Sequence, residues 1–256
     1  MGKIDDIQAY KEWTEYHRSL KRDKAADNLS PVERKKKLEK LEANVIEWIL
    51  FFFSEFAKYP FTKFHKKAIK RITTNMEWYE VLSWSRELAK STIVFMCMMY
   101  LVLTGKKRNV LLISNSHENA VRLLEPYKKA FESNSMLKAY YGDLREFGSW
   151  TADEFTLTTG ATFRAIGALE SPRGTRKDAV RPDTALVDDF DTDADCRNPD
   201  ILKKKWEWFE EALFPTRSIS EDLLVIFCGN LIALDCCVKR AGDKADHWDI
   251  VNIRDK

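Results

Sequence analysis

The sequence predicts an α/β fold: a mostly parallel, doubly wound sheet covered by helices. Three observations support this prediction. From about residue 110 onward, short apolar runs of strand length alternate with stretches whose apolar residues fall at helical spacing. Strands that alternate with helices along a chain are typical of parallel sheets. With 256 residues, of which 45% are hydrophobic, the chain is long enough to bury a sizeable core.

The net charge and the cysteines limit the classes of protein that fit. The net charge is only +2, so contact with nucleic acid requires a local basic patch rather than a global excess of charge. The five cysteines include no CxxC pair, and the adjacent Cys236 and Cys237 are a poor disulfide or metal pattern. Reduced, intracellular thiols are therefore expected.

The first part of the chain, residues 1–58, is expected to be a helical accessory segment in front of a main domain at residues 59–256. Ser30, Pro31 and Glu33 give the pattern of a capped helix start. The basic run RKKK that follows is usually a solvated helix face, and contact with phosphate or a partner is the alternative.

Two apolar runs are too short to cross a bilayer. Residues 45–53 (VIEWILFFF) contain a glutamate, and residues 92–105 (TIVFMCMMYLVLTG) fall short of the roughly 20 residues that a spanning helix needs. Residues 1–40 are charged and lack the apolar stretch of a signal peptide. Both runs are predicted to be buried helices, and no membrane association is expected.

Strands and helices then follow one another. A buried strand at 110–114 precedes a helix that Ser116 caps, and 154–168 is predicted to form two short strands around a Thr-Gly turn. The remaining expected elements are a strand at 183–189, an amphipathic helix at 200–214 and a strand at 222–230.

Polar residues follow several strands at the place where parallel sheets bind ligands, beyond the carboxyl ends. The four features expected at this edge are the loop SRELAKST, the turn SNSH, the pair Asp188–Asp189 and the turn Gly229–Asn230. Their common position predicts a ligand site more strongly than any one of them does alone.

The stretch SWSRELAKST ends almost like a phosphate-binding loop. Such a loop needs inward backbone N–H groups, a lysine that reaches the β- and γ-phosphates, and a hydroxyl that ligates Mg²⁺. Lys90 and Ser91 have the right type and spacing, and the helix from Thr92 would point its N-terminus at the phosphates. Because Trp84 and Ala89 replace the usual glycines, an ordinary helix start is the alternative. We expect Trp84 to pack inward.

An apolar strand that ends in two acids, LVDD (186–189), is the expected partner of such a loop. The first acid, Asp188, would hold Mg²⁺, and Asp189 would orient or deprotonate the attacking water. A strand that ends in a solvated acidic loop is the alternative, because more aspartates follow. Both motifs, in this order and about a hundred residues apart, favour an ATPase.

From residue 59 to about 240, the chain resembles the large terminase subunits of tailed bacteriophages, the motors that pump DNA into procapsids. SRELAKST is similar to the deviant phosphate loop of that family, Ser-Arg-x-x-Gly-Lys-Ser/Thr, which lacks the first glycine. Further similarity lies in LLISNS, LTTGATFRAIGALESPRG with its turn Arg173–Gly174, RPDTALVDD and IFCGN. The resemblance implies an ASCE/RecA-like P-loop fold, hydrolysis of Mg-ATP and translocation of double-stranded DNA.

The resemblance also implies roles for single residues. Lys90 would contact the β- and γ-phosphates, and Arg86 would sense or stabilise the γ-phosphate. Ser91 and Asp188 are the implied Mg²⁺ ligands. Asp189 falls where the family usually has a catalytic glutamate, and its shorter side chain leaves its role as base open. The implied ATP-binding loop consists of Ser85, Arg86, Glu87, Leu88, Ala89, Lys90, Ser91 and Thr92.

Two more segments have implied roles. Gly229 and Asn230 lie in the turn that couples hydrolysis to movement in the family. Tyr59, Phe61 and His65 lie where the family's adenine pocket falls, and a buried aromatic cluster is the alternative.

The implied partners are double-stranded DNA, the portal protein and the small terminase subunit. The resemblance places the chain in the cytoplasm of an infected bacterial host, in a homo-oligomeric ring at the procapsid portal and as a monomer in isolation. The nuclease domain that follows in the family is not expected in this chain. Two alternatives remain open: a helicase-like DNA-dependent ATPase, and a degenerate P-loop module that assembles without hydrolysing ATP.

Overall fold

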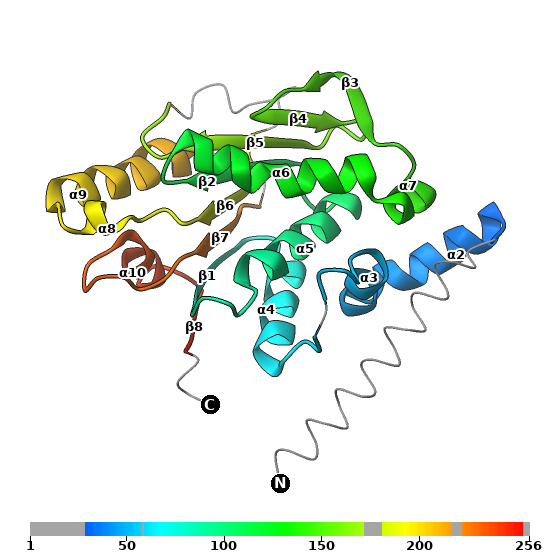
Figure 1. Ribbon diagram of the computed structural model, residues 1–256, viewed down its shortest axis with the longest axis horizontal. Helices are drawn as coiled ribbons and strands as arrows, with labels where there is room; N and C mark the ends of the chain where they lie inside the picture. The colour runs from blue at the N-terminus through cyan, green and yellow to red at the C-terminus, as the bar shows by residue number, and fades with distance from the viewer. Residues whose placement is uncertain (1–28, 58, 172–180, 217–221, 253–256) are drawn as a thin grey trace, which may run out of the picture.

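The computed structural model describes residues 29–57, 59–171, 181–216 and 222–252, and an eight-stranded sheet runs through its centre (Figure 1). The strands are β1 (Trp78–Trp84), β2 (Asn109–Ser114), β3 (Arg145–Trp150), β4 (Glu154–Leu157), β5 (Thr162–Gly167), β6 (Thr184–Asp188), β7 (Leu224–Cys228) and β8 (His247–Val251). They lie in the order β3-β4-β5-β2-β6-β7-β1-β8. Five neighbouring pairs are parallel, and the two pairs that involve β4 are antiparallel.

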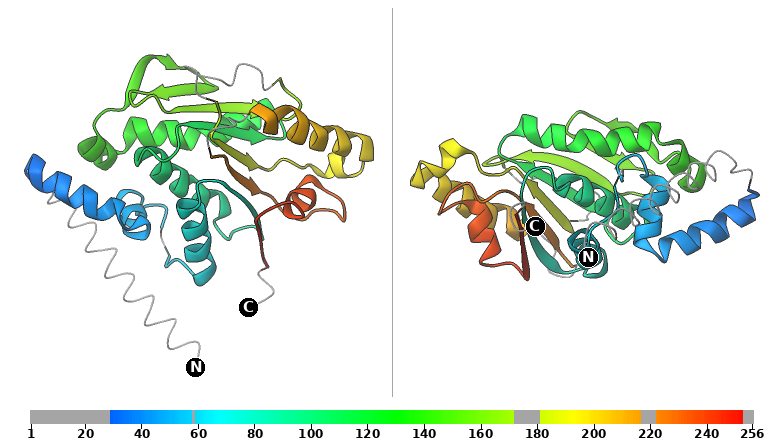
Figure 2. Two further views of the ribbon diagram at one scale, coloured as in Figure 1. Left: turned by 180° about the vertical axis from the view of Figure 1, so that it is seen from behind. Right: turned by 60° about the horizontal axis from the view of Figure 1, so that its bottom comes forward.

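Helices cover both faces of this sheet (Figures 1 and 2). They are α2 (Pro31–Glu42), α3 (Val45–Phe52), α4 (Lys63–Thr74), α5 (Lys90–Leu103), α6 (His117–Ser133), α7 (Ser135–Tyr141), α8 (Asp193–Cys196), α9 (Pro199–Glu207) and α10 (Cys237–Gly242), with a π-helical turn η1 (Trp208–Leu213) and a 3₁₀ turn η2 (Phe214–Thr216). One core joins the sheet to α2 through α7, and a second core joins its other face to α9, η1 and α10. The predicted doubly wound α/β fold is therefore confirmed.

The strand β7 separates the two strands that lead into the predicted motifs. The strand β1 precedes SRELAKST, and β6 ends at Asp188. Leu82 and Asp188 both pair with Cys228, so β6 ends level with a point two residues before the end of β1. One strand between the loop strand and the acid strand is the order expected of an ASCE-type sheet.

The buried strands and helices agree with the apolar pattern. In β2, Leu111 packs into the core on the α9 side and Leu112 into the core on the α5 side, as the alternation of a strand requires. The strands β2, β6 and β7 are buried along their whole length because helices cover both faces. The apolar runs 45–53 and 92–105 form the buried helices α3 and α5, as predicted. Across the described part of the chain, no helix is long and apolar enough to cross a bilayer.

Local predictions also hold. Ser30 and Glu33 form the expected capping box at the start of α2, and Ser116 caps α6. All five cysteines are free. Residues 1–28 and the turn Arg173–Gly174 lie outside the described residues.

Several elements were not predicted, among them α4, α7, β3 and β8. The strands β3 and β8 form the two edges of the sheet and are partly exposed along their length, so they lack a continuous apolar run. The helix predicted at 200–214 is α-helical only to Glu207 and continues as the π-helical turn η1.

Candidate active site

The loop between β1 and α5 begins with a tryptophan that points into the core. Trp84 is fully buried, and its ring packs against Phe64 at 4.9 Å and His65 at 5.5 Å between ring centroids. Both partners belong to α4, so the start of the loop is fastened to that helix. This arrangement confirms the prediction that Trp84 packs inward.

The backbone of the loop is strained at two positions and supported by a histidine. Glu87 has a φ of 69° and Ala89 a φ of 56°, a region that side chains other than glycine rarely adopt. Between them, the carbonyl of Leu88 lies 3.0 Å from Nε2 of His65. Nδ1 of His65 accepts from the backbone N–H of Thr62 at 3.3 Å, so Nε2 carries the proton and donates it to Leu88.

The phosphate loop and the acid strand meet through one short hydrogen bond. Ser91, in the first turn of α5, donates its hydroxyl to Oδ2 of Asp188 at 2.6 Å. Lys90, the first residue of α5, is half-buried beside them. Burial raises the pKa of Asp188 to about 6, against the opposing effects of Ser91 and Lys90. A hydroxyl and a buried carboxylate side by side are hard oxygen donors of the kind that Mg²⁺ takes, so these two residues fit that ion.

Asp189 follows in an exposed position. Its φ is 47°, and its backbone N–H donates to Oδ1 of Asp188 at 3.1 Å. Behind this turn, Nζ of the buried Lys205 donates to the carbonyl of Phe190 and to Oδ2 of Asp195, the latter at 2.8 Å. The lysine therefore fixes the peptide between Phe190 and Asp191, one residue beyond Asp189.

The predicted coupling turn is linked to the same acidic loop through Val238. Asp191 accepts a hydrogen bond from the backbone N–H of Val238, at the start of α10, at 3.0 Å. A Cβ on Gly229 would lie 2.1 Å from Cγ2 of Val238, so only glycine fits there. The backbone N–H of Gly229 donates to the carbonyl of Leu82 in β1 at 3.2 Å. The turn thus contacts the end of β1 and the start of α10.

All four polar features predicted for the carboxyl edge line one cleft of about 640 Å³. Its volume is typical of a site for a nucleotide-sized ligand. The predicted site residues that line it are Arg86, Ser91, Asp188, Asp189, Gly229 and Asn230.

The aromatic segment before α4 lies elsewhere. Tyr59 is 71% exposed, Phe61 is buried, and His65 supports the phosphate loop from below. None of the three lines the cleft among the described residues. Their proposed part in an adenine pocket remains a prediction.

Sequence reasoning missed several residues of the cleft. Asn119 and Arg122 line it from the first two turns of α6, next to Asn115 of the predicted turn SNSH. Their spacing of three places these two residues on one helix face, and their position directly after SNSH was the available signal. Lys205 was missed as well, although a lysine on the apolar face of an amphipathic helix indicates a buried ion pair.

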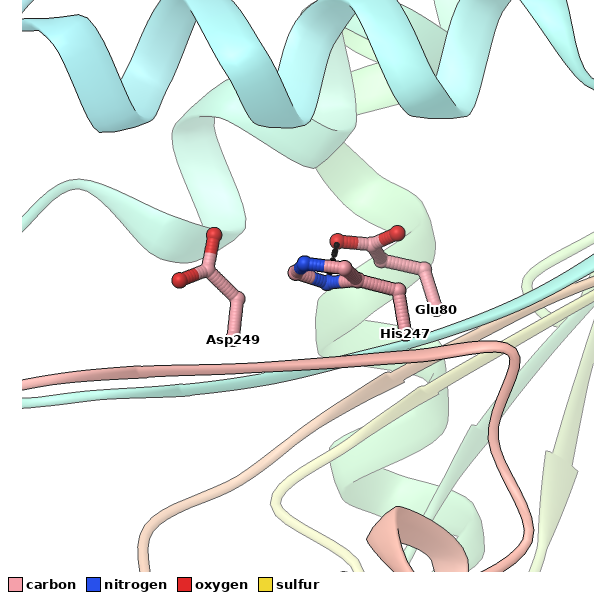
Figure 3. A group of neighbouring side chains, drawn as sticks. All are labelled: Glu80, His247 and Asp249. Carbon is pink, nitrogen blue, oxygen red and sulfur yellow. Dashed lines mark ion pairs between the residues drawn. The ribbon is translucent and has the colours of Figure 1, made fainter.

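A second group of side chains has the composition of a metal site. Glu80, His247 and Asp249 come within reach of one ion, and Figure 3 shows them on neighbouring strands. The guanidinium of Arg71 lies 2.7 Å from a carboxylate oxygen of both Glu80 and Asp249. Because Arg71 already supplies the positive charge between the carboxylates, this group fastens α4 to β1 and β8.

No family model and no curated protein matches the sequence. Among solved structures, the chain is similar to the large terminase of bacteriophage HK97, with 13% identity, a TM-score of 0.45, and coverage of 67% of this chain and 33% of that one. It is also similar to the large terminase ATPase domain of Thermus phage P74-26, with 14% identity, a TM-score of 0.46, and coverage of 79% and 83%. A mutant of that domain gives 14% identity, a TM-score of 0.48, and coverage of 79% and 84%.

The chain thus spans about a third of the length of the HK97 large terminase. With identities of 13–14% and TM-scores below 0.5, these likenesses do not by themselves carry a function over to this chain. The function is instead inferred from the cleft and its residues.

Proposed function

We propose that this chain is an ATPase of the phage large-terminase type, which hydrolyses Mg-ATP in the cleft at the carboxyl edge of the sheet. The observation that supports it most is the 2.6 Å hydrogen bond between Ser91 and Asp188. It joins a lysine–hydroxyl helix start at this edge to a buried carboxylate, in a sheet with one strand between the two motifs. A solvated acidic loop would not bury Asp188, which is 8% exposed.

Each residue has a distinct part in this chemistry. Lys90 and Arg86 supply positive charge to the terminal phosphates. Ser91 and Asp188 would hold Mg²⁺, which neutralises phosphate charge when it is bound. Asp189 stands at the open side of the cleft, where it can accept a proton from the attacking water.

The strained loop argues against the inert P-loop module. A left-handed Ala89 costs about 1 kcal/mol, and such strain is found mainly where a ligand or a switch requires it. Its position as the N-cap of α5, between the cleft-lining Arg86 and Ser91, fits a loop shaped for phosphates.

The role of the ATPase is inferred from the resemblance of its motifs to those of large terminase subunits. In this proposal, hydrolysis drives double-stranded DNA into a procapsid, with the portal protein and the small terminase subunit as partners. Copies of the chain would act as a ring at the portal in the cytoplasm of the infected host.

Thermal unfolding with and without nucleotide tests the site. We expect Mg-ATP to raise the melting temperature, because a ligand at a hundred times its Kd adds about 2.7 kcal/mol to the free energy of unfolding. The variant Ser91→Ala should lose the part of the shift that depends on Mg²⁺ and keep the fold. Absence of both a shift and turnover in the wild-type protein would favour the inert module.

A further inference from the structure

The helix α4 carries an unusual ridge of charge. Lys63, Lys66, Lys67 and Lys70 are all exposed, and we call them the lysine ridge. At about 100° per residue, they fall within an arc of about 100° on one side of the helix. The helix contains no acidic residue, and within the described part of the chain no carboxylate forms an ion pair with these four ammonium groups.

Two exposed basic residues on other helices form ion pairs with nearby carboxylates. In α6, Arg122 pairs with Glu118 one turn away, and in α10 Lys239 pairs with Asp243. The lysine ridge lacks such partners, and it begins at the first residue of α4, where the helix macrodipole disfavours positive charge. The ridge therefore does not serve the stability of the helix, and an external anion is its natural partner.

We propose that the lysine ridge binds the phosphate backbone of double-stranded DNA. This inference rests on the proposed function, since it assigns a binding surface to the DNA that the motor would move. Seven residues of α-helix rise by about 10.5 Å, and phosphates of one DNA strand are spaced by about 3.4 Å along the axis. The ridge thus spans about three consecutive phosphates, and its charge reads no base sequence.

The opposite side of α4 supports the active site. His65, Ile69 and Ile72 face inward, and His65 donates to the carbonyl of Leu88 in the phosphate loop at 3.0 Å. The ridge lies on the outer side and outside the cleft. Neutralising the ridge therefore removes DNA contacts without removing any group that holds nucleotide.

The test compares DNA binding of the wild-type chain with that of a variant in which Lys66, Lys67 and Lys70 are all changed to Gln. Fluorescence anisotropy of a short labelled duplex of arbitrary sequence is measured from about 50 to 200 mM salt. We expect the variant to bind at least tenfold more weakly at the lowest salt. The slope of log K against log salt should become shallower by about 3, because each lost phosphate contact removes about 0.9.

A matched variant controls for net charge. Lys203 and Lys204 in α9 and Lys239 in α10 are exposed on the other face of the sheet, and their change to Gln removes the same three charges. We expect this control to keep the wild-type slope. Circular dichroism checks folding, and the single variant Lys67→Gln gives the same test with a slope change of about 1.

An unchanged slope and affinity in the triple ridge variant would overturn the inference, as would an absence of duplex binding by the wild-type chain. Tighter binding of RNA or of single strands than of duplex would overturn the assignment to double-stranded DNA. Basal ATP turnover without DNA, measured on the same preparations, separates the two proposals. If the chain hydrolyses ATP but the ridge variant binds DNA as the wild type does, only the DNA-binding inference is refuted. If the ridge variant loses DNA binding but the chain does not hydrolyse ATP, only the proposed ATPase function is refuted.

Discussion

Two loops meet at the cleft, and they are held in different ways. The phosphate loop, residues 85–89, is partly exposed and bends through two left-handed residues. Its support includes the hydrogen bond from His65 to Leu88. In the acid loop, residues 188–191, only Asp189 is exposed, and the loop is fixed by Lys205 and by the N–H of Val238.

The difference matches what each loop has to do. A loop that wraps phosphates gains from adjusting when the ligand arrives, and its strain can be relieved by backbone contacts to oxygen atoms. Groups that place a cation and a base must be in position beforehand, since rearrangement during the reaction costs rate. Changes in the acid loop should therefore impair catalysis, and changes in the phosphate loop should mainly alter nucleotide affinity.

The largest effect is expected from Asp188→Asn. Loss of the carboxylate that would hold Mg²⁺ should lower Mg-dependent hydrolysis by a factor on the order of 10³. Steady-state turnover at saturating Mg-ATP measures it. Hydrolysis close to the wild-type rate would show that Asp188 is not part of the active site. The acid loop would then not be the loop that controls catalysis.

The same variant should stabilise the protein without nucleotide at higher pH. Burial raises the pKa of Asp188 from 3.8 to about 6, so the folded state holds the proton more tightly than the unfolded chain. That stabilisation is complete below pH 3.8 and lost as the pH rises through 6. Asparagine does not ionise, so the variant avoids this loss. Between about pH 4.5 and pH 8, its free energy of unfolding in urea should rise by on the order of 2 kcal/mol relative to that of the wild type. Unfolding of the variant at the exposed Asp193, Asp193→Asn, is measured beside it as the control.

Lys205→Met tests the support of the acid loop. The change keeps the buried volume but leaves the carbonyl of Phe190 and the carboxylate of Asp195 without their partner. We expect the free energy of unfolding to fall by about 3 kcal/mol and kcat to fall roughly tenfold, with nucleotide affinity nearly unchanged. The exposed neighbour Lys204→Met is the control. A normal kcat in Lys205→Met would show that this anchoring does not matter for the chemistry.

His65→Ala tests the support of the phosphate loop. It removes the hydrogen bond to the carbonyl of Leu88, which is worth about 1 kcal/mol. We expect the Kd for Mg-ATP to rise roughly fivefold, while kcat at saturation changes little. Nucleotide titration together with turnover separates the two quantities. A fall in kcat of His65→Ala at unchanged affinity for Mg-ATP would show that the phosphate loop controls catalysis, contrary to the role assigned to it.

The smallest effect is expected from Ala89→Gly. Glycine adopts the left-handed backbone of this position freely, so the change should relieve about 1 kcal/mol of strain. Affinity for Mg-ATP should stay the same or tighten by up to about fivefold. Weaker binding in a calorimetric titration would mean that the strained alanine is itself needed to shape the loop.

Most of the fold could be predicted because buried parallel strands leave a strong signal. The strands β2, β6 and β7 and the helix α5 are covered on all sides, so their sequences are continuous apolar runs. Their carboxyl ends meet at one edge by topology, which explains why Ser91 and Asp188 could be expected near each other. The edge strands β3 and β8 carry half-exposed residues and gave no such signal.

The contacts that support the site could not be predicted, because they join segments far apart in the sequence. The place of Lys205 on the apolar face of α9 indicates a buried ion pair, but its partners in and next to the acid loop depend on how α9 packs on the sheet. His65 was predicted as a candidate for an adenine pocket, while its contact with Leu88 depends on how α4 packs on β1. Alanine itself ordinarily favours right-handed helix, so the signal for the left-handed Ala89 was that it stands where a phosphate loop usually has glycine.

The most direct test of the central claim is ATP turnover by Lys90→Ala beside the wild-type chain. Lys90 is the first residue of α5 and contributes charge to the phosphates rather than packing, so the variant should fold normally. We predict Mg-dependent hydrolysis in the wild-type protein and its loss in the variant, with circular dichroism spectra that coincide. Equal turnover by both proteins would contradict the account, because the loop between β1 and α5 would then not be the site of ATP hydrolysis.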